Sequence, residues 1–137
     1  MILVDTNVWS ELLRPNPDAR VQHWEAANAA GLWLSTVVIG ELLSGTELMP
    51  PGQRQQSLRD CYRQMLIDHS DRIADFDLNS ARRYAEVLAH QVRAGRNPGT
   101  ADTQIAATAL ANEMALATRN LRHFEGLGLK LIDPWTE

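Results

Sequence analysis

The sequence predicts an α/β sandwich in which a mostly parallel sheet is covered by helices on both faces. Short apolar runs, such as residues 2–4 and 32–35, alternate with longer segments whose apolar residues recur at helical spacing. This alternation favours right-handed crossovers between parallel strands. The chain has 137 residues, a length that suits one domain spanning residues 1–137.

Polar or turn-forming residues bound the predicted elements. The expected strands are 2–4, 32–35, 73–76, 115–118 and 129–132. The expected helices cover 7–13, 21–30, 36–45, 53–67, 78–94 and 101–114, with a short helix inside 120–125. We expect Gly45 to end the third helix, and Asp77 and Thr100 to cap the helices that follow them. The predicted buried face of the helix 78–94 consists of Ala81, Tyr84, Ala85, Leu88 and Val92.

The composition limits the possible functions. Hydrophobic residues make up 45% of the chain and the net charge is -4, which argues against a broad basic surface for gripping nucleic acid. No export signal is recognisable, and no segment approaches the roughly 20 apolar residues of a membrane helix. The single cysteine, Cys61, cannot form an internal disulfide; we expect it in the core beside Leu58 and Tyr62, and we expect the protein in a reducing cytoplasm.

Three acidic residues occupy unusual positions for surface acids. Asp5 directly follows a buried strand, Glu41 lies in an apolar helix, and Asp102 lies at a helix start. Each has a simpler interpretation, because Asp5 and Asp102 suit helix N-termini and an amphipathic helix can turn one Glu to solvent. In folds with a mostly parallel sheet, ligands bind in a crevice at the carboxyl ends of the strands, where Asp5 and the residues after Thr118 would lie.

Carboxylates that share one pocket either have raised pKa values or recruit cations, and Mg²⁺ or Mn²⁺ prefers such oxygen ligands. A bound ion would make the pocket attractive to phosphate and activate water for attack on a phosphodiester. The three acids together therefore predict a metal-dependent nuclease. A phosphatase with an aspartyl nucleophile is a weaker alternative, because Asn7 stands where such enzymes place a second acid.

Four segments resemble one known family in their order along the chain. They are Ile2-Leu3-Val4-Asp5-Thr6-Asn7, the run from Ser35 to Leu42, the helix start Thr100-Ala101-Asp102-x-x-Ile105-Ala106, and Ala117-Thr118-Arg119-Asn120 followed by Phe124. With the closing Asp133-Pro134-Trp135, the set resembles the PIN-domain toxins of the VapC or FitB type. The resemblance covers essentially the whole chain.

This resemblance implies a PIN-like α/β/α sandwich with about five strands and an endoribonuclease that needs Mg²⁺ or Mn²⁺. It implies RNA as substrate, a cognate antitoxin protein as partner, and a homodimer. By position, Asp5, Glu41 and Asp102 would be catalytic and metal-binding, with polar support from Thr6 and Thr118. The sequence does not identify the RNA that is cut.

One position departs from the family pattern. Asn120 stands where many relatives have a further acid, with His123 and Glu125 slightly beyond. An Asn side chain can still orient water, so we expect polar support from Asn120, but a second metal would bind more weakly. The alternative is therefore a catalytically weak or inactive PIN-fold module that binds RNA or a protein partner. Arg119, beside the expected pocket, is the best candidate for contacting the RNA backbone.

Overall fold

The computed structural model describes residues 1–137, and its strands form one sheet in which every neighbouring pair is parallel. The order across the sheet is β3-β2-β1-β4-β5, so β1 is the central strand. The strands are β1 (Ile2–Val4), β2 (Leu32–Ser35), β3 (Ile73–Ala74), β4 (Ala115–Ala117) and β5 (Leu131–Ile132). The predicted parallel sheet of about five strands is confirmed.

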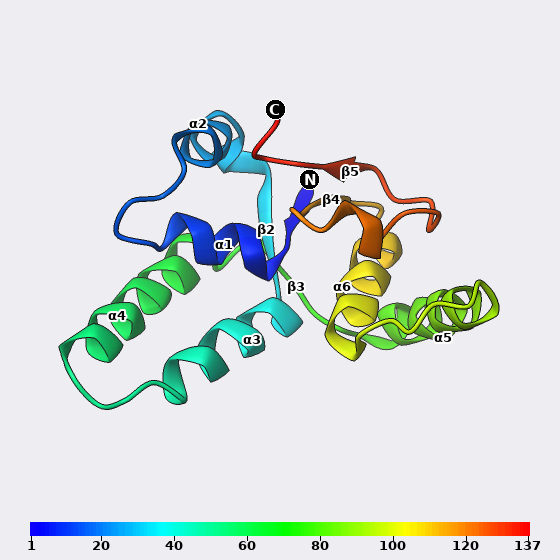
Figure 1. Ribbon diagram of the computed structural model, residues 1–137, viewed down its shortest axis with the longest axis horizontal. Coiled ribbons are helices and arrows are strands. Elements are labelled where there is room, and N and C mark those ends of the chain that lie inside the picture. The colour runs from blue at the N-terminus through cyan, green and yellow to red at the C-terminus, as the bar shows by residue number, and fades with distance from the viewer.

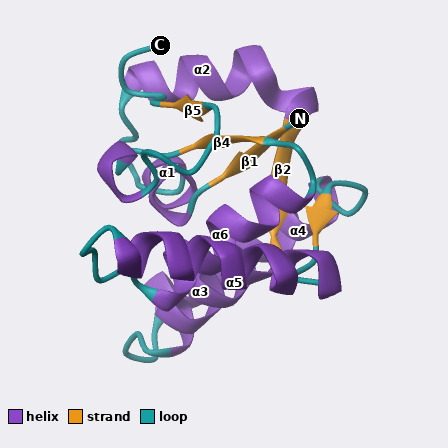
Figure 2. Ribbon diagram, turned by 90° about the vertical axis from the view of Figure 1, so that its right-hand side faces the viewer, coloured by secondary structure: helices purple, strands orange, loops and turns teal.

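Helices cover both faces of this sheet. Figure 2 shows α2 on one side of the sheet and the α5 and α6 pair on the other. Figure 1 shows α3 and α4 below α1, whereas α2 lies above α1. The helices are α1 (Thr6–Leu12), α2 (Ala19–Asn28), α3 (Thr36–Glu47), α4 (Gln53–Asp68), α5 (Leu78–Arg93) and α6 (Thr100–Ala111), with 3₁₀ turns η1 (Ala29–Gly31) and η2 (Leu121–His123). None of them has both the length and the apolar composition needed to cross a membrane.

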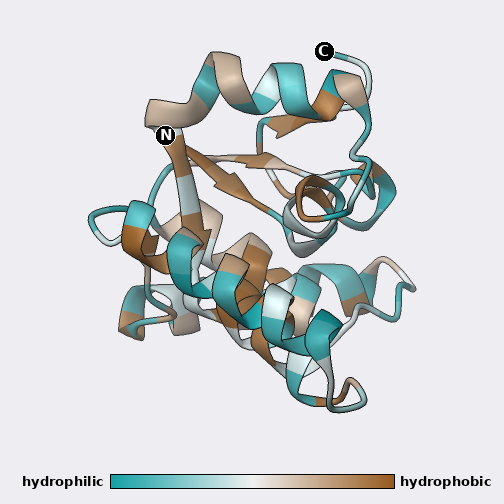
Figure 3. Ribbon diagram, turned by 90° about the vertical axis from the view of Figure 1, so that its left-hand side faces the viewer, coloured by the Kyte–Doolittle hydropathy of each residue, from teal (hydrophilic) through white to brown (hydrophobic).

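The core lies around the three inner strands. Leu3 and Val4 of β1, Leu34 of β2 and Leu116 of β4 are fully buried. Strands buried on both faces are expected to be apolar throughout, which is why these short runs carry no alternation of polar residues. Figure 3 shows the same contrast, since the strands are largely brown and much of the outer helical surface is teal.

The sheet register places the polar residues that follow the inner strands at one edge. Val4 lies opposite Ala117, so Asp5 and Thr118 emerge side by side from neighbouring strands. The backbone N–H of Asp5 still donates to the Ala117 carbonyl at 2.9 Å, which ties Asp5 to the end of β4. On the other side of β1, Ser35 ends β2 and caps α3 by accepting from the Val38 N–H. The carboxyl edge of the sheet is therefore where chemistry can be built.

Several element bounds differ from the predictions: α6 ends at Ala111 rather than at 114, β3 ends at Ala74, and β5 begins only at Leu131. Two further differences concern the end of α3 and the start of α6. Helix α3 continues through Gly45 to Glu47, because the buried Thr46 donates to the Leu42 carbonyl and its own carbonyl accepts from Gln55. Helix α6 starts one residue earlier than expected. Gly99 is its N-cap, and Thr100 is the first helical residue. The expected cap at Asp77 is confirmed, since its side chain accepts from the Ser80 N–H.

Two burial predictions are wrong. Helix α5 buries Ser80, Val87 and Gln91, whereas Val92 is 59% exposed. The buried polar groups are tolerated because they are hydrogen-bonded, as shown by the Gln91 amide donating to the His123 carbonyl. Cys61 is exposed on α4 rather than part of the core, because α4 turns its neighbour Tyr62 inward instead.

Candidate active site

The three acids predicted from the sequence line one cavity. Its volume is about 420 Å³, and Asp5, Glu41 and Asp102 all border it, although they come from three different elements. We call it the acidic hollow. Its remaining lining residues are Thr6, Asn7, Ser10, Glu11, Arg14, Arg119, Asn120 and Trp135. The sequence-based expectation that these acids share one crevice is therefore met.

Asp5 is a buried carboxylate held by three hydrogen bonds. It is only 4% exposed and serves as the N-cap of α1, with Oδ1 accepting from the Thr6 N–H at 2.8 Å. Its Oδ2 accepts from the Thr118 hydroxyl at 2.8 Å and from the Asn7 amide at 3.1 Å. The capping role and the position in the hollow thus coexist, and the bonds fix the direction of the carboxylate.

The surroundings of Asp5 disfavour its charged form. Burial is the main cause that raises the pKa of Asp5 above its ordinary value, and the negative charges of Asp102 and Glu41 raise it further. Hydrogen bonds from Thr118 and from the Thr6 N–H act in the opposite direction without cancelling the shift. A positive charge placed in the hollow would relieve this repulsion, which is the electrostatic condition for holding a cation.

Glu41 and Asp102 line the hollow from two different helices, α3 and α6. Glu41 is exposed on α3, and its Oε1 accepts from the Thr6 hydroxyl at 2.6 Å. Asp102 lies half-buried in the first turn of α6, and its Oδ2 lies 2.9 Å from Nδ1 of His123. His123 is exposed on the short helix η2 and is a direct neighbour of Asp102.

Thr118 connects the polar groups behind Asp5. It is fully buried at the end of β4, donates to Asp5, and accepts from the Asn120 N–H at 3.0 Å. Asn7 donates to the same hydroxyl at 3.4 Å and accepts from the Arg119 N–H at 3.3 Å. The loop after β4 is therefore fastened to the loop after β1 through side chains.

Arg119 and Asn120 border the hollow at the surface. The Arg119 guanidinium lies 4.8 Å from the centre of the Trp135 ring, a cation–π distance that holds a positive charge beside the acids. Asn120 is exposed and borders the hollow. Both residues therefore line the same cavity as the three acids.

Sequence reasoning assigned no role to three further residues of the hollow. Asn7 bonds to Asp5, Trp135 packs under Arg119, and Glu11 is an acid that is only 8% exposed. Glu11 accepts from the Asp18 N–H at 3.2 Å and pairs with Arg14 at 3.5 Å. No sequence signal singles out Glu11, because it lies six residues after Asp5, whereas neighbours on one helix face are three or four residues apart.

The donor chemistry of the hollow fits a hydrated divalent ion. Carboxylate, hydroxyl and amide oxygens are the ligands that Mg²⁺ and Mn²⁺ prefer. No group of three or more acidic, histidine or cysteine side chains is arranged closely enough to hold a metal ion directly. Mg²⁺ rarely needs such a group, because it usually keeps several waters and takes one or two protein carboxylates. Burial, together with the negative charges of Asp102 and Glu41, raises the pKa of Asp5, and a bound cation would compensate the negative charge that this site disfavours.

Comparisons with known proteins agree in both sequence and structure. The PIN-domain family model matches residues 2–128. Plasmid stability protein StbB of Pseudomonas syringae pv. tomato is 46% identical, covering 98% of this chain and 99% of its own. VapC ribonuclease Y4jK of Sinorhizobium fredii is 39% identical, covering 98% of both chains. Toxin FitB of Neisseria gonorrhoeae is 34% identical, covering 98% of this chain and 99% of its own.

The backbone arrangement is shared as well. The crystal structure of FitAcB from Neisseria gonorrhoeae superposes with a TM-score of 0.93 at 34% identity and covers 100% of both chains. The likeness therefore extends from the sheet to both chain ends. It includes the carboxyl edge of the sheet, where Asp5 and Thr118 lie.

Proposed function

Because this chain belongs to the PIN-domain family, we propose that its acidic hollow is the active site of a divalent-metal-dependent endoribonuclease. The observation that carries the proposal is the meeting of Asp5, Glu41 and Asp102 in one cavity. The relative named VapC ribonuclease supports the choice of RNA as substrate. We propose further that residues 1–137 form one PIN domain that acts in the cytoplasm.

Asp5, Asp102 and Glu41 would hold Mg²⁺ or Mn²⁺, in part through the waters that such an ion keeps. When bound, the ion would supply an activated water and charge stabilisation for hydrolysis of a phosphodiester. Asp5 presents a fixed oxygen because Thr118, Asn7 and the Thr6 N–H orient its carboxylate. We assign one ion rather than two, since Asn120 adds no charge to the three acids.

The positive groups around the hollow would position the RNA. Arg119 is kept at the rim by Trp135, and Arg14 lines the same space. Phosphate groups are commonly held by arginine, which fixes the register of a nucleic acid without reading its sequence. The surface as a whole is acidic, so a phosphodiester would be drawn to this site only by the local cations.

We also propose that the protein is the toxin of a toxin–antitoxin pair and forms a homodimer. The relative named Toxin FitB and the FitAcB crystal structure support the first point. For the dimer, the support is the exposure of apolar side chains on α5, where Leu78 and Val92 are 66% and 59% exposed. Light scattering of the purified protein tests the dimer, and co-purification with the product of the neighbouring reading frame tests the antitoxin.

Cleavage of RNA by the purified protein tests the proposed activity. We expect cutting with Mg²⁺ or Mn²⁺, none with EDTA, and a loss in Asp5→Ala and Asp102→Ala proteins. Asp60→Asn is the matched control, because Asp60 is an exposed acid on α4 away from the hollow. Cutting that survives EDTA or both alanine variants would indicate contamination, and would favour a PIN-fold module that binds RNA or a protein without cutting.

A further inference from the structure

A second cavity adjoins the acidic hollow. It has a volume of about 310 Å³ and lies between the end of α5, the start of α6 and the segment around η2. We call it the side cavity. Asp102 lines both spaces, so the two cavities meet at one of the carboxylates assigned to the metal. A group in the side cavity would therefore lie next to Asp102, one of the carboxylates of the proposed active site.

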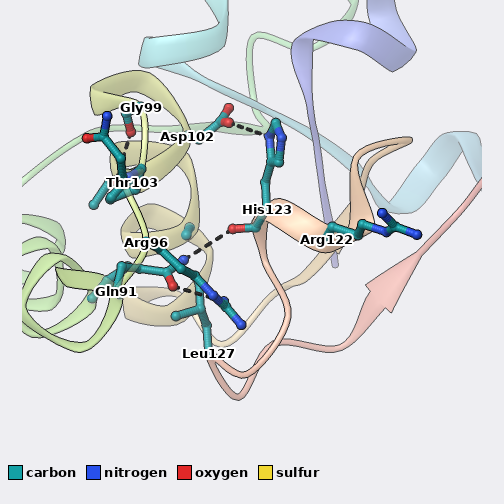
Figure 4. Close-up of a pocket in the computed structure, with 12 residues that line it drawn as sticks. Gln91, Arg96, Gly99, Asp102, Thr103, Arg122, His123 and Leu127 are labelled. Atoms are coloured by element: carbon teal, nitrogen blue, oxygen red, sulfur yellow. Dashed lines mark hydrogen bonds and ion pairs between the residues drawn. The ribbon is translucent and has the colours of Figure 1, made fainter. Parts of the chain in front are cut away.

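The walls of the side cavity differ from those of the acidic hollow. Val87, Ala106 and Leu127 give it an aliphatic wall, whereas Trp135 is the one hydrophobic residue that lines the acidic hollow. Asp102 is its one acidic lining residue, and its carboxylate is paired with His123, which lines the same cavity (Figure 4). An apolar surface next to a few oriented polar groups is typical of sites for small organic ligands.

Arg96 is the positive group that this cavity holds in place. One guanidinium nitrogen, Nη1, donates to Oε1 of Gln91 and to the Glu125 carbonyl, both at 2.9 Å. Gln91 is itself only 2% exposed and donates to the His123 carbonyl at 3.2 Å. Figure 4 shows Arg96 between Gln91 and Leu127, whereas the Arg122 guanidinium points away from the other labelled side chains. Arg96 thus offers its remaining N–H groups in a fixed direction.

We propose that the side cavity binds one unpaired nucleotide of the RNA, next to the phosphodiester that is cut. This rests on the proposed ribonuclease function. The volume is at the lower end of the roughly 300–1,000 Å³ range of ligand sites, which suits one nucleotide and excludes a duplex. The base packs on Val87, Ala106 and Leu127, and Arg96 donates to its acceptor atoms.

This assignment explains how an acidic protein can select its RNA. Sequence-specific recognition of RNA relies on unstacked bases whose edges meet oriented side chains. A guanidinium is a donor-only group, so bases that present acceptors toward Arg96 are favoured over those that present amino groups. The base in the side cavity therefore contributes to the choice of cleavage site, while Asp5, Glu41 and Asp102 serve every phosphodiester equally.

Titration with nucleotides tests the site without any cleavage. Metal-free protein is titrated with each 5′-nucleoside monophosphate, each nucleoside and inorganic phosphate, while backbone amide resonances are followed by NMR. We expect saturable shifts at Gly99, Thr103 and Leu127 with nucleotides and nucleosides but not with phosphate. Equal shifts with phosphate alone would reduce the cavity to an anion site, and shifts confined to the acidic hollow would overturn the proposal.

Two variants separate the side cavity from general effects. Arg96→Ala should weaken nucleotide binding about tenfold, as expected when one charge-assisted hydrogen bond is lost. Arg93→Ala is the matched control, because Arg93 is an exposed arginine in the last turn of α5 that does not line the cavity. Leu127→Trp fills the space from a surface loop without removing charge, and should weaken binding as well. Unchanged binding in both Arg96→Ala and Leu127→Trp would refute the site.

The same variants give a second result in RNA cleavage. We expect Arg96→Ala to raise KM and to change the preferred base next to the cut, with kcat close to that of the unmodified protein. A fall in kcat alone, with base preference unchanged, would show that Arg96 only supports the local structure. If the unmodified protein does not cut RNA, the proposed function fails. The nucleotide titration still tests whether the side cavity binds a nucleotide.

Discussion

Replacing Thr118 with valine removes one hydroxyl from behind the acidic hollow and preserves the shape of the side chain. Thr118 is fully buried and donates to Asp5 at 2.8 Å, so the loss falls on a hydrogen bond to a charged group. Such bonds contribute roughly 1.5–3 kcal/mol, and we expect about 2 kcal/mol of destabilisation at neutral pH. For a chain of this size, this lowers Tm by roughly 6 °C.

The pH dependence of this loss identifies Asp5 as its cause. The pKa of Asp5 is raised above 3.8 in the folded chain, so its protonation stabilises the fold at low pH, and this contribution is lost as the pH rises through the raised value. The Thr118 bond lowers that pKa, so removing the hydroxyl raises it further. The difference in stability between the two proteins should therefore be largest at neutral pH and shrink as Asp5 becomes protonated.

Thermal unfolding monitored by circular dichroism over a pH series measures this difference. Thr108→Val is the matched control, because Thr108 is also fully buried but its hydroxyl donates to the Gln104 backbone carbonyl within α6. Its effect should be smaller and independent of pH. The reasoning is refuted if the two variants lose equal stability, or if the Thr118→Val loss does not change with pH.

Three more predictions concern the hollow and the helix ends. Glu41→Gln should reduce RNA cleavage on the order of 100-fold, while Tm changes little because Glu41 is exposed; Glu47→Gln on the same helix should leave cleavage intact. Mn²⁺ at about 100 times its Kd should stabilise the protein by roughly 2.7 kcal/mol in calorimetry, and this gain should disappear with EDTA and in Asp102→Ala. Asp18 caps α2, and its side-chain hydrogen bond from Arg20 holds the pKa of the carboxyl at about 2. Its contribution is therefore present above 3.8 and lost as the pH falls through about 2, so the Tm deficit of Asp18→Ala should shrink over that interval.

The positions of the strands and of the three acids could be predicted because they depend on local signals. Buried strands are short apolar runs, and a polar residue directly after such a run marks the edge of a sheet. Asp5 and Thr118 carry this signal clearly, and the ordered family motifs add Glu41 and Asp102. The residues at the carboxyl edge of the sheet could therefore be predicted from the sequence.

What escaped prediction depends on tertiary contacts. The buried face of α5 contains Ser80 and Gln91, which are polar and are buried only because partners elsewhere in the fold satisfy them. A prediction from helical periodicity uses only the spacing of hydrophobic residues, and it therefore places Val92 on the buried face, although Val92 is exposed. The side cavity was invisible for the same reason, because it is assembled from α5, α6 and the segment around η2 rather than from any one motif.

The order of the strands has a consequence for how the chain is made. Strand β1 (Ile2–Val4) lies between β2 and β4, and β4 comes from residues 115–117. During translation β1 lacks one of its two neighbours until residues 115–117 have left the ribosome, and Asp5 lacks the Thr118 hydroxyl that orients it. A chain that terminates before residue 115 would therefore lack the proposed nuclease activity.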